Sequence, residues 1–284
     1  IPKSLDEAAA MDGAGHWRIF WDVIMPLSRP GLITLSIFTF LGNYGSFFWP
    51  LVLINVLCAW GVALFCYRMA RWEGDAGQAR VGAGVFVCLP LVYAATIIIR
   101  MDILFLLFIS ASLVSFYEGH ERNDLRLLAL SAACVFLAVF TKGAYGLLIP
   151  FVTGLLFACW TRDQRALRRI VAATLCAGGL IAAWLCAMAR WVDHAYLRMM
   201  LGTQTIDRAI APQDHKEGWW YYFPYALLVF LPWMVFALSR LKERWGVYTR
   251  YERFLVAWLA GGFALLSMTG SKLFLYLLIV APPV

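Results

Sequence analysis

Long uncharged apolar segments follow one another along most of this chain. No charged residue occurs between Arg29 and Arg68, and further apolar runs continue toward Val284. Only 14% of the residues are charged, whereas charged residues make up about a quarter of an ordinary soluble domain. Inside a bilayer each segment has to satisfy its own backbone hydrogen bonds, which favours helices. The sequence therefore predicts an all-α polytopic membrane protein.

The apolar runs predict about nine to ten transmembrane helices. The expected spans are 31–49, 51–67, 81–99, 103–117, 127–140, 144–160, 170–189, 219–239, 254–269 and 273 onward, with the weakest signal at 127–140. A single helix over 31–67 would be about 55 Å long, far beyond a hydrocarbon core of about 30 Å. Gly42, Gly45 and Pro50 offer a break, so we expect two passes there.

The distribution of lysine and arginine predicts the orientation of these spans. Loops 68–80, 118–126, 161–169 and 240–253 hold fourteen of these residues, whereas the alternating turns at 100–102, 141–143 and 270–272 and the loop 190–218 hold seven. Because cytoplasmic loops are enriched in positive charge, the first set should be cytoplasmic and the second outside. This topology accounts for the net charge of +7, and nothing else in the sequence favours a nucleic-acid partner.

The N-terminal residues follow a recognisable spacing. Glu7-Ala8-Ala9 is followed by Asp12-Gly13 and then by Val23-Ile24-Met25-Pro26. We expect the two alanines to lie on a short helix that a partner can approach closely, and Gly13 to form the turn that ends it. Trp17, Ile19, Phe20 and Val23 then give an apolar stripe on a second helix. An ordinary interfacial amphipathic helix is the alternative interpretation.

A further stretch, Asn43-Tyr44-Gly45-Ser46-Phe47-Phe48-Trp49-Pro50, completes the pattern. Residues 1–54 resemble the C-terminal part of an ABC sugar-importer permease, of the family of binding-protein-dependent transport inner membrane components. The N-terminal spacing resembles the coupling loop of these permeases, which is called the EAA motif. The resemblance implies that Glu7, Ala8, Ala9, Asp12, Gly13 and Pro26 dock onto an ABC ATPase subunit. Val23 and Met25 stand where this family usually has Ile and Leu. The spans that would precede this loop in a permease are not in the sequence, which we expect to be a fragment.

Four different short motifs lie at the predicted outer ends of later spans. They are Arg100-Met101-Asp102, Phe140-Thr141-Lys142-Gly143, Trp219 to Pro224 with Pro232-Trp233, and Gly270-Ser271-Lys272 with Tyr276 and Pro282-Pro283. In this order, residues 57–284 resemble the protein mannosyltransferase and lipid A aminoarabinose transferase family. The resemblance implies a GT-C membrane fold and a polyprenyl-phosphate sugar as donor, in a bacterial cytoplasmic (inner) membrane.

Lys142 and Lys272 are the candidate ligands for the donor phosphate. Both sit at predicted outer turns, and two cations on one side could hold a phosphate diester. The alternative is that each lysine simply reaches the interface. Arg100, Asp102 and Tyr276 lie near the same site by motif, where Arg100 and Asp102 could also form a plain ion pair. The aromatic cluster at 219–223 is typical of an interfacial belt.

No cofactor is predicted from the sequence, although the chemistry would tolerate a divalent metal. Asp193-His194 and Asp214-His215-Lys216-Glu217 in loop 190–218 have no recognised ligand spacing, and we interpret them as solvated charges. The seven cysteines all lie in predicted spans without a CxxC motif, which argues against disulfides and zinc sites.

The general base of the reaction is missing from the sequence. In the resembled family an acidic residue in the first outer loop acts on the acceptor, but the junction at 49–57 contains no Asp or Glu, and Asp102 is a poor substitute by position. Sugar transfer requires such a base within reach of the attacking group. We therefore expect a chimeric chain with an inactive glycosyltransferase fragment. The alternatives are a permease subunit that functions through residues 1–54, or no function in either part.

Overall fold

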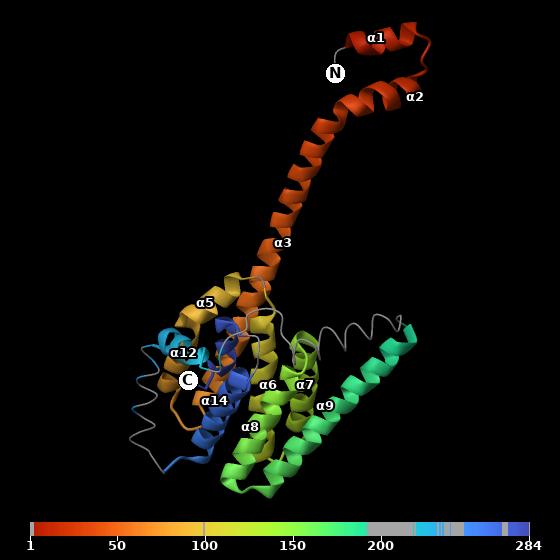
Figure 1. Ribbon diagram of the computed structural model, residues 1–284. Coiled ribbons are helices and arrows are strands. Elements are labelled where there is room, and N and C mark those ends of the chain that lie inside the picture. Colours follow the sequence, from red (N-terminus) through yellow and green to blue (C-terminus); the bar gives the residue numbers. More distant parts are fainter. Residues whose placement is uncertain are drawn as a thin grey trace. The chain divides into compact units, whose positions relative to one another are not determined.

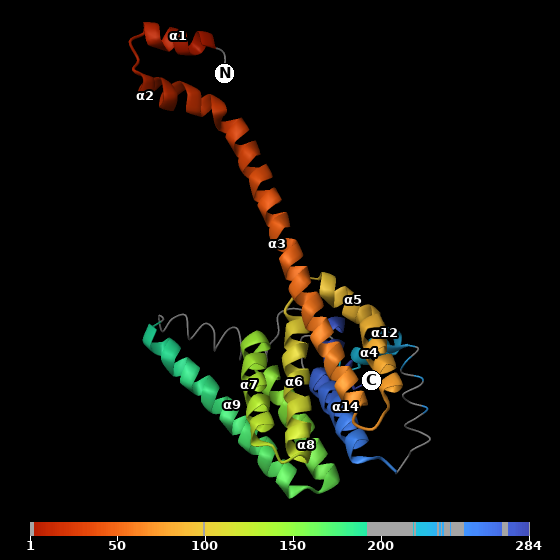
Figure 2. The same cartoon turned by 180° about the vertical axis from the view of Figure 1, so that it is seen from behind.

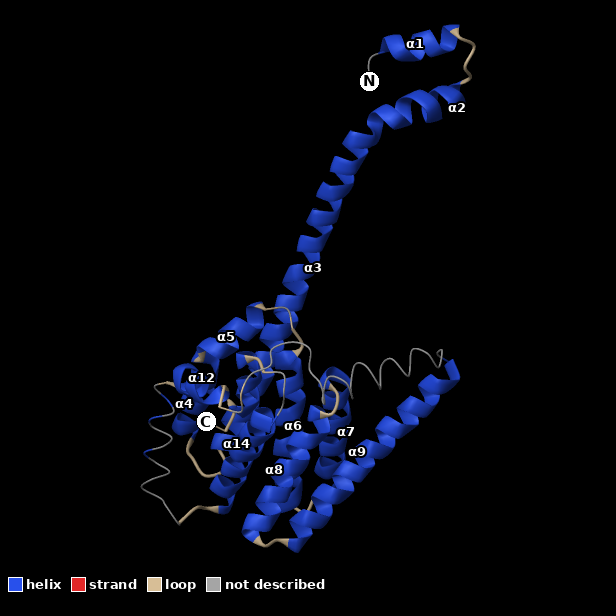
Figure 3. Cartoon of the chain, in the orientation of Figure 1, coloured by secondary structure: helices blue, strands red, loops and turns tan. Residues whose placement is uncertain are grey.

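The computed structural model is helical, with no strand in the part of the chain that it describes (Figure 3). It describes residues 3–98, 100–191, 218, 220–231, 233, 235, 239, 247–268 and 272–283. The chain divides into two compact units, Ile1–Leu53 and Ile54–Val284, which we call unit 1 and unit 2. The predicted all-α fold is confirmed.

Unit 1 begins with two short helices joined by a glycine turn. Helix α1 (Lys3–Met11) carries Glu7, Ala8 and Ala9, as predicted. It ends where Gly13 adopts φ +79°, with hydrogen bonds from the Gly13 N–H to the Ala10 carbonyl and from the Ala14 N–H to the Ala9 carbonyl. This is a Schellman motif, whose positive φ favours glycine. Helix α2 (His16–Ile19) follows and continues through a π-helical segment, η1 (Phe20–Ile24).

Helix α3 is continuous from Met25 to Ala70, where two passes were predicted. The expected break at Gly42, Gly45 and Pro50 is wrong, because all three lie inside the helix. Glycine and proline weaken a helix, but an apolar segment has no partner for its remaining N–H groups except its own carbonyls. Hydroxyl groups add to these bonds: Ser46 donates to the Gly42 carbonyl at 3.1 Å. The boundary between the two units falls within this helix.

Unit 2 is built around helix α6. The helices that follow α3 are α4 (Ala76–Cys88), α5 (Pro90–Ile97), α6 (Asp102–Glu121), α7 (Leu125–Lys142), α8 (Tyr145–Thr161), α9 (Gln164–Trp191), α12 (Tyr222–Phe230), α14 (Arg250–Met268) and the 3-10 helix η3 (Phe274–Val280). Helices α6 and α7 pack side by side, as do α7 with α8, α8 with α14, and α9 with both α7 and α8 (Figures 1 and 2). Helix α6 also contacts η3.

The core of unit 2 is aromatic and aliphatic. Its largest fully buried side chains include Trp258, Tyr222, Phe105, Phe116 and Phe157. The Trp258 indole N–H donates to the Ile279 carbonyl at 3.1 Å, which satisfies its only polar atom in the core. This bond fastens η3 to α14.

Several predicted spans correspond to single helices of unit 2. The expected spans 103–117, 127–140, 144–160, 170–189 and 254–269 are α6, α7, α8, α9 and α14, so the weakest prediction, 127–140, is confirmed as a helix. Among the described residues, four helices are long and apolar enough to cross a membrane, and the bent pair α4–α5 makes a fifth if it counts as one span. The chain is an integral membrane protein.

The predicted number of spans exceeds this count for several reasons. Helix α8 counts only as a shorter apolar helix, and α14 is not among the candidate spans. Two expected spans are joined in α3, and part of the segment 219–239 lies outside the described residues. The span expected from 273 onward is wrong in type, because Phe274–Val280 forms a seven-residue 3-10 helix. That is far shorter than the roughly 20 residues of a membrane helix. Its apolar character serves the core instead, since Leu275, Leu277 and Leu278 are buried there.

Candidate functional site

Asp102 is the first residue of α6, and its side chain is only 4% exposed. The Arg100 Nε donates to its Oδ2 at 2.9 Å, and the Lys142 ammonium donates to its Oδ1. A carboxylate in the first turn of a helix is favoured by the helix dipole. The structure thus brings Arg100, Asp102 and Lys142 together, and we call these three residues with Tyr276 the Asp102 cluster.

The end of α7 directs Lys142 toward this carboxylate. Lys142 is the last residue of the helix, and Gly143 follows with φ +65° and ψ −141°, a backbone conformation that residues other than glycine rarely adopt. Gly146 continues the turn, and a Cβ there would lie 2.3 Å from the Val139 nitrogen. The glycines therefore permit the tight turn that leaves Lys142 beside α6. The predicted Lys142-Gly143 pair has a clear structural role.

Helix η3 supplies the third side of the cluster. The Lys142 Nζ lies 4.2 Å from the centre of the Tyr276 ring and 5.5 Å from that of Phe105, so the ammonium has cation–π contacts in addition to its ion pair. Lys272 lies four residues before Tyr276 and is buried, with 3% exposure. Its neighbour Leu273 donates its backbone N–H to the Tyr222 hydroxyl at 3.3 Å.

The Asp102 cluster has one carboxylate for two cations, and it keeps one net positive charge. Arg100 is 41% exposed and Lys142 is 21% exposed, so the carboxylate is buried while its partners remain accessible. Such an arrangement can bind an anion. The predicted ion pair between Arg100 and Asp102 is present, and Lys142 points to a carboxylate rather than only to the interface.

The docking residues predicted in unit 1 lie on one short stretch. Glu7, Ala8, Asp12 and Pro26 are exposed, and Ala9 is half-buried. The predicted apolar stripe of the second helix is mostly exposed as well: Trp17 is 77% and Phe20 38% exposed, whereas Ile19 is buried. Other predicted features lie outside the described residues, namely Asp193, His194, the stretch 214–217, Trp219, Pro232 and Gly270-Ser271.

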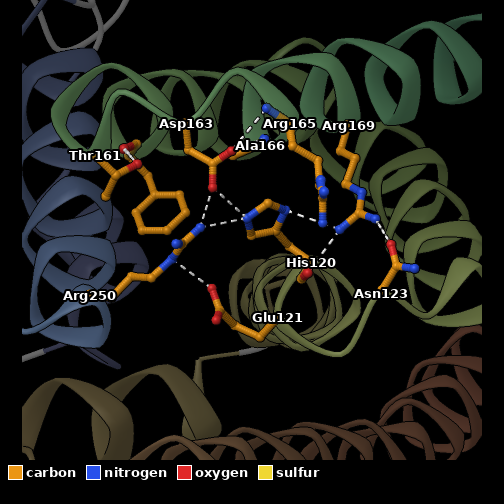
Figure 4. A network of polar contacts seen from close by, with 10 residues as sticks. His120, Glu121, Asn123, Thr161, Asp163, Arg165, Ala166, Arg169 and Arg250 are labelled. Carbon is orange, nitrogen blue, oxygen red and sulfur yellow. Dashed lines mark hydrogen bonds and ion pairs between the residues drawn. The ribbon is translucent and has the colours of Figure 1, made fainter.

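A second polar cluster lies at the C-terminal end of α6, whereas Asp102 lies at its N-terminal end (Figure 4). This cluster was not predicted from the sequence. We call it the His120 cluster; its members are His120, Glu121, Asn123, Asp163, Arg169 and Arg250. His120 Nε2 lies 3.0 Å from Asp163 Oδ2, and Arg169 lies 3.2 Å from His120 Nδ1. Arg250 pairs with Asp163 and, at 2.8 Å, with Glu121. The cluster ties α6, the α8–α9 turn and the start of α14 together.

The hydrogen bonds of this cluster stabilise the ionised form of Asp163. Both ring nitrogens of His120 face a guanidinium group: Arg169 lies 3.2 Å from Nδ1, and Arg250 lies 2.7 Å from Nε2, which is also 3.0 Å from Asp163 Oδ2. Burial alone would raise the pKa of Asp163, but the Ala166 N–H, Arg250 and His120 all donate to its carboxylate and hold its pKa below the usual range. Asp163 also caps α9 through the Arg165 and Ala166 N–H groups.

The sequence held one signal for the His120 cluster. Asp163 stands immediately before the helix α9, where an aspartate is typical of a helix cap. Its contact with Arg250, 87 residues later, is a matter of tertiary packing. Similarly, the Glu118 carboxylate accepts from the Trp72 indole at 3.1 Å and from Arg68 Nε at 2.6 Å. No local pattern predicts these pairs.

The described side chains of the Asp102 cluster do not form a metal site. Within the described ranges, no group of three or more His, Cys, Asp or Glu side chains is arranged to hold a metal ion. All seven cysteines are free. A cavity of about 310 Å³ in unit 2 is lined mainly by apolar residues such as Met69, Phe86 and Leu255, and Tyr251 also lines it.

The N-terminal part of the chain is similar to ABC importer permeases. The model of the family "Binding-protein-dependent transport system inner membrane component" matches residues 1–115, which is less than half of the chain. The diacetylchitobiose uptake permease NgcG of Streptomyces coelicolor is 45% identical over 53 residues, or 19% of this chain and 18% of that protein. The glucose import permease GlcU of Saccharolobus solfataricus is 50% identical over 55 residues, or 19% of each chain. The predicted permease resemblance is confirmed.

The fold is similar to that of ArnT from Cupriavidus metallidurans. The apo crystal structure of ArnT aligns with a TM-score of 0.65 at 19% identity and covers 82% of this chain and 43% of ArnT. The structure of ArnT bound to undecaprenyl phosphate aligns with a TM-score of 0.64 and covers 83% of this chain. The second predicted resemblance is therefore confirmed as a likeness of fold. The chain spans about a fifth of the permeases and under half of ArnT.

Replacing Asp163 by asparagine should destabilise the protein. The Asp163→Asn variant loses the ion pair with Arg250 and the acceptor for His120, and we expect a loss of about 1–3 kcal/mol in the free energy of unfolding at pH 7. Because the folded pKa is depressed, this stability is present above the unfolded value of about 3.9 and is lost as the pH falls below it. The difference between wild type and variant should therefore stay constant from pH 7 to about pH 5 and shrink as the pH falls below about 4.

Thermal unfolding in detergent micelles, followed by tryptophan fluorescence, measures this difference. Asp75→Asn is the matched control, because Asp75 also caps a helix, through the Gln78 N–H, but among the described residues it takes no part in the ion pairs of the His120 cluster. Asparagine caps helices about as well as aspartate. Equal effects of the two substitutions would contradict the role given to the Asp163 ion pair.

Proposed function

We propose that unit 2 is a fragment of an integral-membrane glycosyltransferase that binds a polyprenyl-phosphate sugar. The observation that carries this proposal is the Asp102 cluster, which presents two accessible cations around one buried carboxylate. Its residues belong to the motifs that resemble the lipid-linked sugar transferases, and the fold is similar to that of ArnT, one structure of which holds undecaprenyl phosphate. The acceptor in this proposal is a lipid or a protein.

Lys142 and Arg100 would bind the donor phosphate through their charges. Asp102 holds both cations in place, and the Tyr276 ring fixes the ammonium from another side. A charge-assisted hydrogen bond to phosphate is about twice as strong as a neutral one. Lys272, buried four residues before Tyr276, would contribute to the same phosphate site from the segment that leads into η3.

We expect this phosphate binding without sugar transfer. In the reaction the acceptor oxygen would attack the anomeric carbon, the bond from that carbon to the phosphate oxygen would break, and polyprenyl phosphate would leave with inversion. A base has to remove the acceptor proton. Asp102 is buried, and both of its carboxylate oxygens are already paired, with Arg100 and with Lys142. The junction segment 49–57 offers no carboxylate.

The Lys142→Gln variant should bind polyprenyl phosphate at least tenfold more weakly. The substitution removes the net positive charge of the Asp102 cluster, and a tenfold loss corresponds to about 1.4 kcal/mol. Binding of undecaprenyl phosphate to the purified chain in micelles, measured by microscale thermophoresis, tests this. Lys142→Arg should keep most of the affinity.

The matched control for this experiment is Arg71→Gln, which removes one exposed cation from the loop 68–80. Its affinity should equal that of the wild type. A Lys142→Gln chain that folds, as judged by its circular dichroism, and binds like the wild type would overturn the proposed site. Formation of glycosylated acceptor by the wild type would instead overturn only the proposed inactivity.

The family match supports a second proposal, for residues 1–54. We propose that this segment derives from the permease of an ABC sugar importer and docks to the ATPase subunit of such an importer through Glu7, Ala8, Ala9, Asp12, Gly13 and Pro26. The exposed alanine and glutamate of α1 fit a close approach by a partner. The separation of unit 1 from unit 2 at Leu53 is consistent with such an origin.

Ala8→Arg should abolish co-purification of the full chain with a sugar-importer ATPase subunit. Ala8 is exposed, so the arginine disturbs the docking surface without disturbing the fold. Ala10→Arg is the matched control, because Ala10 is also exposed in α1 but lies about 200° around the helix from Ala8, and this variant should bind as the wild type does. Loss of binding in both variants would point to charge rather than to the docking surface.

The two proposals together imply a chimeric chain in a bacterial cytoplasmic membrane, joined near residue 54. If the join exists in the source genome, amplification from its DNA should yield one uninterrupted product that encodes Gly31 to Gly84. If no product that spans the join is obtained, the two parts belong to different proteins. The permease and transferase proposals would then apply to each part separately.

A further inference from the structure

The turn between α8 and α9 concentrates positive charge at the edge of an apolar helix. Residues 161–169 contain Arg162, Arg165, Arg168 and Arg169 and one acidic residue, Asp163. Arg162 ends α8 in the left-handed conformation, and the other three arginines lie in the first two turns of α9. None of these four arginines belongs to the Asp102 cluster or to unit 1.

The acidic residue of this turn is already engaged. Asp163 accepts from His120 and Arg250 and caps the first turn of α9, while Arg169 donates to the His120 carbonyl at 2.8 Å and to Asn123. Arg162, Arg165 and Arg168 are exposed, and in the described part of the chain no ion pair joins them to a carboxylate. Three guanidinium groups are therefore left to bind an anion.

The position of these arginines indicates which anion. From Ile170 the helix α9 runs without charge to Arg190, so the arginines lie directly beside the start of a candidate membrane span. Arg162 and Ile170 are eight residues apart, and the arginines of α9 lie within about 8 Å of the apolar segment along the axis. The headgroup layer of a bilayer is about 5–8 Å deep on each side. Trp160, 42% exposed and in edge contact with Tyr248, is typical of that depth.

We infer that Arg162, Arg165 and Arg168 bind the headgroups of anionic phospholipids. Guanidinium groups form bidentate hydrogen bonds with phosphate, and each basic residue near an anionic membrane surface contributes about 1 kcal/mol, or about fivefold, to the preference. The loop 68–80 provides the contrast. Its exposed Arg71 and Arg80 share that loop with the carboxylates Glu73 and Asp75, and its third arginine, Arg68, pairs with Glu118 of α6, so its positive charges are balanced.

Spin-label electron paramagnetic resonance tests this inference. The full chain is reconstituted in phosphatidylcholine vesicles that contain about one mole per cent of spin-labelled phosphatidylglycerol or, in a parallel sample, spin-labelled phosphatidylcholine. The motionally restricted fraction of each probe gives its relative association constant. We expect the wild type to prefer phosphatidylglycerol several-fold, and the preference to fall to about unity in Arg165→Gln/Arg168→Gln.

Arg71→Gln/Arg80→Gln is the matched control, because it removes the same charge from the loop that carries its own carboxylates. This variant should keep the preference of the wild type. An equal loss in both variants would mean that only net charge matters, and a wild type without preference would mean that no headgroup site exists; either result overturns the inference. Circular dichroism of each variant confirms that the helices are retained. The outcome is independent of undecaprenyl phosphate binding at Lys142.

Discussion

The burial of one carboxylate at the start of α6 organises unit 2. Asp102 is nearly inaccessible, and a charge in an apolar interior is stable only when it is paired and hydrogen-bonded. Its pairing with Lys142 fixes the end of α7, and the contact of Lys142 with Tyr276 fixes η3. The glycine turn after Lys142 follows from the same requirement. A single desolvated group thus determines the relative positions of three elements that also form the candidate site.

Helix α6 carries its charged groups only at its two ends. Asp102 opens the helix, Glu118, His120 and Glu121 close it, and the segment between them has no charge. Twenty residues of helix are about 30 Å long, which matches the hydrocarbon thickness of a bilayer. Both clusters therefore lie where water or headgroups can solvate the exposed partners of each buried charge. This arrangement lets the most buried helix of unit 2 hold charged groups at little cost.

The sequence predicted the features that depend on local pattern. The helices of unit 2, the turn at Gly13 and the pairing of Arg100 with Asp102 follow from residues close together in the chain. The His120 cluster did not follow, because its partners come from three separate turns and only the fold brings them together. The segment from 273 was also mispredicted. Hydropathy measures how apolar a segment is, and Leu277 is equally apolar in a membrane helix and in a buried 3-10 turn.

The continuity of α3 follows from the same locality of helical hydrogen bonds. Each N–H bonds to a carbonyl four residues earlier, so two apolar segments of different origin can join as one helix without any mark in the backbone. Pro50 and Gly45 weaken α3 without ending it. Side-chain packing, in contrast, depends on partners far along the chain, and it divides the chain at Leu53. An unbroken helix is therefore no argument for a single ancestry. The packing partners change within α3, whereas the similarity to the permease family continues through residue 115.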